Sequence, residues 1–309
     1  MKELYDCSVI GGGPSGLTAA LTLVRAKRRI IIFDSSNGRN SSSAHSHNYL
    51  TRDGTSTHEM KELGKAEILR YSTANFKNAQ VNKITKNQDV FQLITDDGVY
   101  NTKKIIFATG ARDVFPTIDG FDQFWGKSLF SCPYCDAYEF SDKPIIIISE
   151  NPSLLYSFSK KMLNWTKDIV VCTNGKKALT DKQRESLLQR GYKISDQEVK
   201  CLKGCNGALE RVEFMDGTSV KVCGGVMAPT RVEPGSTLPA SLGCSMNAFG
   251  ITTDVLGKTN VGGVFAAGDN VHSHLSQVSI ACASGSKAAI GVNTELSEEE
   301  FNLYRVSKL

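Results

Sequence analysis

The chain has 309 residues, which predicts two domains at roughly 100–200 residues per domain. Hydrophobic residues make up 40%, no apolar run reaches the ~18 residues of a membrane-spanning helix, and the apolar N-terminal stretch is too short for a signal peptide. A net charge of +4 without a dense basic block excludes a typical nucleic-acid-binding protein, so we expect a cytoplasmic protein with no membrane or nucleic-acid partner.

The first segment predicts a strand at Tyr5–Ile10, a glycine-rich loop, a helix at Leu17–Ala26 and a second strand at Ile30–Phe33. This strand–loop–helix–strand order is the context in which a glycine loop binds the phosphates of a dinucleotide. The loop and the acid that ends the second strand supply the predicted binding residues, which are Gly11, Gly13, Pro14, Ser15, Gly16 and Asp34.

Each of these positions has a physical role in that context. Gly11 permits a tight turn, Gly13 lets the backbone approach a pyrophosphate, and Gly16 lets the helix pack closely on the strand. The helix N-terminus offers free N–H groups to the phosphates. Asp34 can accept both ribose hydroxyls, which favours FAD or NAD over a cofactor with a 2′-phosphate.

The next part of the chain is predicted to complete this domain. Ser35–Thr57 is a long polar loop, Met60–Tyr71 has helical periodicity, and Lys104–Ala108 is a buried strand that ends at Thr109-Gly110. Three alternating runs predict a small antiparallel insert with a turn at Asp97-Gly98, namely Ala79–Thr85, Val90–Thr95 and Val99–Thr102.

A second unit begins near Pro116 and returns to the first at Pro229–Pro234. Its predicted elements are strands at Pro144–Ser149, Ile169–Cys172 and Gly225–Ala228, helices at Ser153–Trp165 and Thr180–Arg190, and a hairpin at Ala208–Val222. A strand at Val264–Ala267 and a helix at Gln277–Gly291 follow. The sequence thus predicts an α/β protein with two dinucleotide-binding, Rossmann-like, three-layer ββα domains, residues 116–231 being inserted between residues 1–115 and 232–309.

Two further segments resemble, together with the glycine loop, the three FAD signatures of flavoproteins with two dinucleotide-binding domains. They are Ile105–Gly110, which reads IIFATG, and Gly263–Asp269, which reads GVFAAGD. The resemblance implies that Asp269 contacts the ribityl–pyrophosphate region and that the helix start at Gln277 and Val278 faces the flavin. It adds Ala108, Thr109, Gly110 and Gly268 to the predicted FAD site.

The segment Cys132-Pro133-Tyr134-Cys135-Asp136 predicts redox chemistry. The spacing allows a disulfide, and a cysteine at a helix start has a lowered thiol pKa. Asp136 is placed to carry a proton as thiols form and leave. Two alternatives remain: half of a zinc site completed by Cys201 and Cys205, or buried thiols without a role. The total of 9 cysteines is odd, which argues against a structural disulfide framework, and we predict no bound metal.

These motifs, found in this order over nearly the whole chain, resemble the low-molecular-weight thioredoxin reductases. The resemblance implies that Cys135 is the flavin-proximal sulfur, Cys132 the interchange thiol and Asp136 the proton donor and acceptor. It also implies a homodimer, with a thioredoxin-like protein or a small disulfide or dithiol as partner.

The chain also resembles a narrower group, the FAD-dependent dithiol oxidases of the holomycin and gliotoxin pathways. The segments that carry this resemblance are Gly38-Arg39-Asn40, the stretch Ala44–Gly54 and CPYC. Many of those proteins carry His after the second Cys, where this chain has Asp136 as thioredoxin reductases do, so the substrate stays open. The predicted FAD contacts extend to Arg39, Asn40, Asn48 and Val81. His45 and His47 are candidates for a place near the flavin, although a lone histidine more often has a structural role.

The pattern departs from thioredoxin reductases where they bind NADPH. Their second glycine loop is replaced by Ser149-Glu150-Asn151-Pro152-Ser153, and their basic cluster by Thr173-Asn174-Gly175-Lys176-Lys177. NADPH binding is therefore uncertain. Electrons can instead pass to oxygen or come from a protein donor such as ferredoxin, or NADPH can bind in an atypical mode. A non-enzymatic flavin redox sensor is the remaining alternative.

Overall fold

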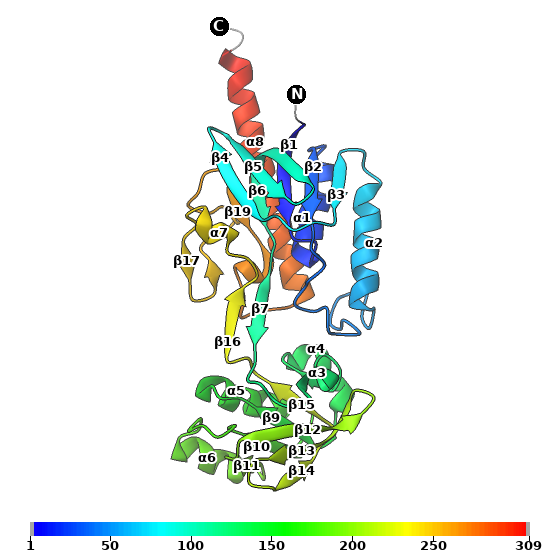
Figure 1. Ribbon diagram of the computed structural model, residues 1–309, viewed down its shortest axis with the longest axis vertical. Coiled ribbons are helices and arrows are strands. Elements are labelled where there is room, and N and C mark those ends of the chain that lie inside the picture. The colour runs from blue at the N-terminus through cyan, green and yellow to red at the C-terminus, as the bar shows by residue number, and fades with distance from the viewer. Residues whose placement is uncertain (1–2, 307–309) are drawn as a thin grey trace. The chain divides into compact units, whose positions relative to one another are not determined.

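The structure, a computed structural model, describes residues 3–306. These residues form two compact units (Figure 1). The first unit consists of residues up to Arg39, His58–Arg112 and Glu233 onward, and the second consists of Asn40–Thr57 and Asp113–Val232. No helix within the described residues is both long and apolar enough to cross a membrane.

The first unit is built on a mixed sheet of seven strands, with the order β3-β2-β1-β6-β5-β4 and β19 also paired to β6. β1, β2, β3, β6 and β19 are parallel, whereas β4, β5 and the first part of β6 form an antiparallel meander. The strands are β1 (Leu4–Ile10), β2 (Ile30–Phe33), β3 (Ala74–Lys77), β4 (Lys83–Asn87), β5 (Val90–Thr95), β6 (Gly98–Phe107) and β19 (Val264–Ala266).

Apolar side chains cover both faces of this parallel sheet. On one face, the helices α1 (Pro14–Arg25), α2 (Thr57–Leu69) and α8 (Val278–Val306) pack against residues such as Val9 and Ile106. On the other face, Phe33 and Phe107 pack against the meander and the segment that holds α7 (Leu238–Ser241), β17 (Met246–Asn247) and β18 (Gly250–Ile251). This burial on both faces explains the continuous apolar run of β2, which reads IIIF.

The second unit has a five-stranded parallel sheet with the order β11-β10-β9-β15-β8 and a separate antiparallel sheet, β12-β13-β14. The strands are β8 (Leu129–Phe130), β9 (Ile145–Ile148), β10 (Ile169–Cys172), β11 (Lys193–Ser195), β12 (Val199–Cys205), β13 (Ala208–Phe214), β14 (Ser219–Lys221) and β15 (Gly224–Met227). The helical segments are α3 (Phe121–Phe124), α4 (Pro133–Asp136), η1 (Tyr138–Phe140), α5 (Pro152–Met162) and α6 (Asp181–Leu188).

Alternation along β9 explains how the layers of this unit assemble. Ile145 and Ile147 pack with α5 and α6, whereas Ile146 and Ile148 pack against the β12–β14 sheet. Successive side chains of a strand point to opposite faces, so the run of four isoleucines serves two cores at once. The unit is a three-layer ββα fold, and this confirms the predicted fold class.

The chain enters the second unit in β7 (Ala111–Val114) and leaves it in β16 (Arg231–Pro234), and these two strands pair. Several local predictions differ from the structure, and the short strands β8, β11, β17 and β18 were not predicted. β6 is one strand because its first residues extend the meander and its last residues pair with β1 and β19. β3 and β12 were missed, and α8 runs well past the predicted end at Gly291.

The loop Asn40–Thr57 belongs by its contacts to the second unit, whereas the sequence prediction placed it in residues 1–115. A backbone bridge between Ser46 and Thr55 closes the loop on itself. The Thr57 hydroxyl donates to the Ser43 carbonyl at 3.0 Å. Loops without regular structure give no periodic signal, so their tertiary partners cannot be inferred from sequence pattern.

Candidate functional site

The glycine loop between β1 and α1 is shaped by two close backbone approaches. Gly11 has φ +112°, and a Cβ added there would lie 2.2 Å from the Ala108 carbonyl oxygen. A Cβ at Gly16 would lie 1.9 Å from the Gly11 carbonyl oxygen. Real Cβ atoms do not approach so closely, so both positions require glycine for the packing of strand, loop and helix.

Gly13 differs because the space beside it is open. A Cβ added at Gly13 would meet no protein atom within 4 Å. Gly13 is the residue that precedes α1, no side chain of the described residues caps this helix, and Pro14 stands in its first turn. An uncapped helix N-terminus next to open space is a cradle that fits a pyrophosphate.

Asp34 ends β2 beside this cradle. Its Oδ1 accepts the backbone N–H of Gly12 at 3.2 Å, and its Oδ2 lies 2.5 Å from the Lys61 ammonium nitrogen. These contacts hold a buried carboxylate at the end of the strand, where an acid can accept ribose hydroxyls. Lys61, on α2, is a neighbour that the sequence analysis did not single out.

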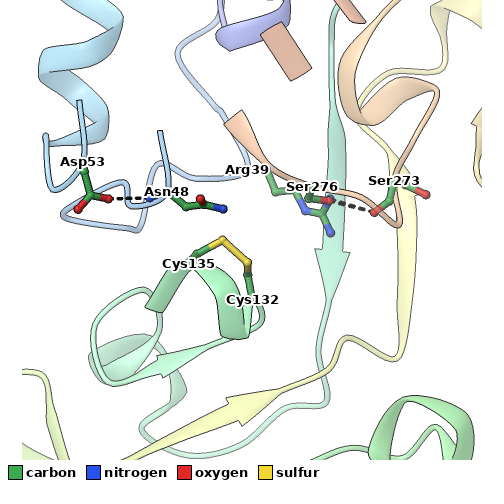
Figure 2. The surroundings of a disulfide bond; sticks show 7 residues. All are labelled: Arg39, Asn48, Asp53, Cys132, Cys135, Ser273 and Ser276. Carbon is green, nitrogen blue, oxygen red and sulfur yellow. Dashed lines mark hydrogen bonds between the residues drawn. A yellow bond between two sulfur atoms is a disulfide. The ribbon is translucent and has the colours of Figure 1, made fainter. Parts of the chain in front are cut away.

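A second group of predicted residues surrounds the start of η2 (Gly268–Asn270). Arg39 donates to Asp269 Oδ2 at 2.8 Å, and it also donates to the Ser273 carbonyl at 3.3 Å and to the Ser276 hydroxyl. Figure 2 shows Arg39 with Ser273 and Ser276, whose hydroxyl donates to the Ser273 carbonyl at 3.0 Å. The first unit therefore holds Arg39 and Asp269 as an ion pair.

Asn270 was missed by the sequence analysis although it follows Gly268-Asp269 directly. Its Oδ1 accepts the Thr109 hydroxyl at 3.0 Å, while its Nδ2 is buried without a hydrogen-bond partner among the described residues. A buried donor without a partner is costly, and a bound ligand can satisfy it. A Cβ at Gly268 would lie 2.5 Å from the Ser15 hydroxyl oxygen, so η2 and the glycine loop are neighbours.

The first unit thus brings together most of the predicted FAD residues: the glycine loop, Asp34, Arg39, Ala108–Gly110, Gly268 and Asp269. α8 begins at Val278, directly after Gln277, as the prediction required. Val81 lies in the apolar core of this unit. Asn40 and Asn48 lie in the second unit. The open cradle, the held acid and the unpaired Asn270 donor fit an FAD molecule.

Cys132 and Cys135 form a disulfide in the second unit, with their Cα atoms 5.3 Å apart (Figure 2). Cys132 precedes the short helix α4, and its carbonyl accepts the N–H groups of Cys135 at 3.0 Å and Asp136 at 3.2 Å. The zinc alternative gains no support, because Cys201 donates to Glu213 and Cys205 to Glu210. No group of three residues able to hold a metal ion occurs among the described residues.

Asp136 is a carboxyl group with a perturbed pKa beside this disulfide. Burial raises the pKa of Asp136 to about 6, the negative charge of Glu139 adds to the rise, and His47 opposes it. A carboxyl group that titrates near neutral pH can both take up and release protons under physiological conditions. This arrangement suits the proton transfer expected at Asp136.

The loop Asn40–Thr57 supplies His47 to this region. His47 Nε2 lies 3.7 Å from Glu139 Oε1, and His47 Nδ1 lies 3.7 Å from Asp53 Oδ1. The N–H of Asn48 donates to Asp53 Oδ1 at 2.7 Å (Figure 2). His45 instead contacts the Gly54 carbonyl through Nδ1 at 3.1 Å. Only His47 of the two candidate histidines therefore pairs with the segment that follows CPYC.

The helix start in the second unit that corresponds to the FAD cradle is closed. The Asn151 side chain accepts the N–H groups of Ser153 at 3.0 Å and Leu154 at 3.1 Å, and Pro152 has no N–H. Glu150 accepts the Asn174 side-chain amide at 2.7 Å. The first N–H donors of α5 are thus used within the protein, and an acid stands beside them.

The fold and these motifs define a class: an oxidoreductase with two dinucleotide-type folds, with a helix start that fits FAD in one and the Cys132–Cys135 disulfide in the other. Within this class, the family model for pyridine nucleotide-disulphide oxidoreductases matches residues 5–285, and the chain belongs to this family. It is a thioredoxin reductase-like, FAD-dependent thiol–disulfide oxidoreductase, as the sequence analysis expected.

Relatives of similar length support this assignment. The thioredoxin reductase aclD of Aspergillus oryzae is 31% identical over 310 residues, spanning 96% of this chain and 98% of the relative. The crystal structure of HlmI has a TM-score of 0.93 at 33% identity, covering 99% of this chain and 98% of HlmI. The structure of TrxB from Bacillus anthracis, assigned as a thioredoxin reductase, has a TM-score of 0.91 at 36% identity, covering 96% and 99%.

Proposed function

We propose that this protein oxidises a small dithiol through Cys132–Cys135 and passes the electrons to FAD, without using NADPH at the second dinucleotide-type fold. The observation that carries the proposal is the Asn151 side chain, which occupies the N–H groups at the start of α5. Family membership supports the disulfide and flavin chemistry. The closed helix start supports the choice of electron partner.

A comparison of the two helix starts gives the physical reason. Before α1, a glycine leaves open space and no side chain takes the N–H groups. Before α5, Asn151 takes two N–H groups and Glu150 adds negative charge. A pyrophosphate bound at α5 would have to displace a capping side chain, whose loss costs about 0.5–2 kcal/mol, and would meet a carboxylate.

In the proposed reaction, a substrate thiolate attacks Cys132 Sγ, the Cys132–Cys135 bond breaks, and Cys135 leaves as a thiolate. The second substrate thiolate then attacks the sulfur bonded to Cys132, which forms the substrate disulfide and releases Cys132 as a thiolate. The substrate loses two electrons and two protons, and Asp136 is placed to carry protons in these steps. FAD, when bound, would supply the two-electron acceptor that is needed for Cys132 and Cys135 to re-form their disulfide.

Most of the residues predicted to contact FAD belong to the first unit. Gly13 and the start of α1 would hold the pyrophosphate, Asp34 the ribose, and Arg39 with Asp269 the ribityl–pyrophosphate region. Oxygen is the proposed final electron acceptor. A homodimer and a thioredoxin-like substrate are further proposals that rest on the resemblance, and a cytoplasmic location is one that rests on the composition. A ferredoxin-type electron donor is the alternative that the altered second glycine loop leaves open.

Anaerobic reduction of the purified protein tests this proposal. We expect dithiothreitol to bleach the flavin absorbance near 450 nm rapidly, and we expect oxygen to restore this absorbance. NADPH and NADH should bleach it far more slowly than dithiothreitol does. Fast bleaching by NADPH would overturn the assignment of the electron partner. Absence of sustained turnover with every thiol and acceptor would favour a redox sensor without catalysis.

Variants of the cysteines test the route of the electrons. Cys135→Ser and Cys132→Ser should each keep FAD bound and lower dithiol-dependent flavin reduction by at least about 10³-fold, because neither can re-form the disulfide. Cys223→Ser removes an exposed free cysteine and is the matched control. Undiminished turnover in Cys135→Ser would show that electrons bypass this pair.

A further inference from the structure

The loop Asn40–Thr57 carries a histidine whose role the reaction as described does not use. His47 lies between two carboxylates, with Nδ1 3.7 Å from Asp53 Oδ1 and Nε2 3.7 Å from Glu139 Oε1. Its side chain is 28% exposed, so it touches both the solvent and the interior of the second unit. The two carboxylates that it contacts, Asp53 and Glu139, are both more exposed than His47 itself.

One carboxylate lies near each nitrogen of the ring. Asp53 is held by the N–H of Asn48, next in the chain to His47, at 2.7 Å. Glu139 follows the CPYC segment in η1 and is three residues from Asp136. The imidazole is thus oriented by a loop carboxylate on one nitrogen and by a carboxylate of the disulfide segment on the other. A carboxylate near one nitrogen of an imidazole restricts the orientation of the ring.

The charges that act on Asp136 come from these same residues. Glu139 disfavours the ionised form of Asp136, and His47 favours it. The charge of Asp136 therefore depends on the charges of the residues around it. Oxidation of a dithiol releases two protons, and only one of them can reside on Asp136 at a time.

We propose that His47 is a positioning residue for proton transfer at the Cys132–Cys135 disulfide: placed between Asp53 and Glu139, it offsets the negative charge of Glu139 beside Asp136. This inference rests on the proposed role of Asp136 in dithiol exchange.

The test titrates Asp136 directly, so it does not depend on turnover. Protein labelled with ¹³C at the aspartate carboxyl carbon is followed by NMR from pH 4 to 9, and the Asp136 signal is identified by its loss in Asp136→Asn. His47→Gln should move the Asp136 midpoint upward by about half a pH unit or more, because a favourable charge is removed. Glu139→Gln should move it downward, because an unfavourable charge is removed.

His45→Gln is the matched control, because it removes the other imidazole of the same loop. It should leave the Asp136 midpoint where the unchanged protein has it. The pH dependence of dithiothreitol oxidation should follow the midpoints, with its acid limb moved upward in His47→Gln and downward in Glu139→Gln. A His47→Gln midpoint equal to that of His45→Gln would overturn the assignment of His47.

The two readouts separate the possible failures. Shifted NMR midpoints with no dithiol turnover in any form of the protein would contradict the proposed function and leave the coupling of His47 to Asp136 standing. A merely structural role of His47 would lower stability and rate at every pH and leave the midpoint unmoved. That outcome also overturns the inference.

Discussion

Asp136 is a carboxyl group that the fold keeps largely out of water, and its charge links stability to the proposed chemistry. Burial comes first among the causes that raise the pKa of Asp136 to about 6. A folded-state pKa above the unfolded value means that the folded protein binds this proton more tightly. The stabilising contribution is complete below about pH 4 and is lost as the pH rises through about 6.

Asp136→Asn should therefore be more stable than the unchanged protein at pH 7.5, by about 1–2 kcal/mol after allowance for partial solvent exposure. Near pH 4 the two proteins should have nearly equal stability. Urea unfolding at both pH values measures the difference, and the substitution should at the same time slow dithiol oxidation. Equal stability of the two proteins at both pH values would contradict the raised pKa.

Two glycines of the same loop should respond oppositely to the same substitution. Gly13→Ala adds a methyl group where no protein atom lies within 4 Å, so the protein without flavin should keep its stability within about 0.5 kcal/mol. The methyl group would occupy the space proposed for the pyrophosphate, so FAD affinity should fall about 10-fold or more. Gly16→Ala should lower stability by more than about 2 kcal/mol, because its methyl group would collide with the Gly11 carbonyl.

Flavin content after purification and thermal unfolding of the flavin-free proteins measure both effects. Gly217, in the β13–β14 turn, is no control because its positive φ strains any other residue. Gly262, which has ordinary φ and open space, is suitable, and Gly262→Ala should change neither quantity. Full flavin occupancy in Gly13→Ala would remove the cradle from the proposed FAD site.

At the scale of secondary structure, α1 and α5 start in opposite ways although each follows a buried parallel strand, β1 or β9, of its unit. α1 begins without a side-chain cap, and α5 begins with Asn151 as its cap and Pro152 in its first turn. A helix N-terminus that offers its N–H groups to a phosphate is destabilised until the ligand arrives. The capped α5 is stabilised by its own side chain and needs no ligand.

Asn151→Ala should accordingly lower stability by about 1 kcal/mol, because two N–H groups lose their acceptor. Asn151→Ser should be nearly neutral, since serine also caps helices. Urea unfolding measures both. Neither variant should gain fast reduction by NADPH, because Glu150 and Pro152 still stand at this helix start, and a gain would show that the cap alone had excluded the nucleotide.

At the scale of the whole molecule, two dinucleotide-type units lie in one chain, and the geometry predicts that only the first binds a nucleotide cofactor. Hydrogen exchange followed by mass spectrometry tests this. Adding FAD to flavin-free protein should slow exchange in Pro14–Arg25 and Gly268–Asn270, with a stabilisation of about 2.7 kcal/mol at 100 times the dissociation constant. Adding NADPH should leave Pro152–Met162 unchanged, and protection there would contradict the proposal.

Much of the fold followed from local pattern. The glycine loop, the run of isoleucines in β9 and the hairpin turn at Asp216-Gly217 are local signals, and the predicted elements around them agree with the structure. β3 was missed because Ala74–Lys77 has no fully buried residue and hence no clear alternation. The single strand β6 was divided because it changes from a half-exposed to a fully buried environment along its length.

The sequence by itself determined the class of protein, because glycine positions, strand-ending acids and the CPYCD spacing are local and each has a backbone reason. Only the tertiary structure decided which side chains act on one another across long stretches of chain. It placed His47 beside Glu139 and paired Arg39 with Asp269, and it left Asn270 Nδ2 without a hydrogen-bond acceptor among the residues that the structure describes. Such contacts join segments that folding alone makes neighbours, and burial, which sets the charge of Asp136, does not exist until the chain has folded.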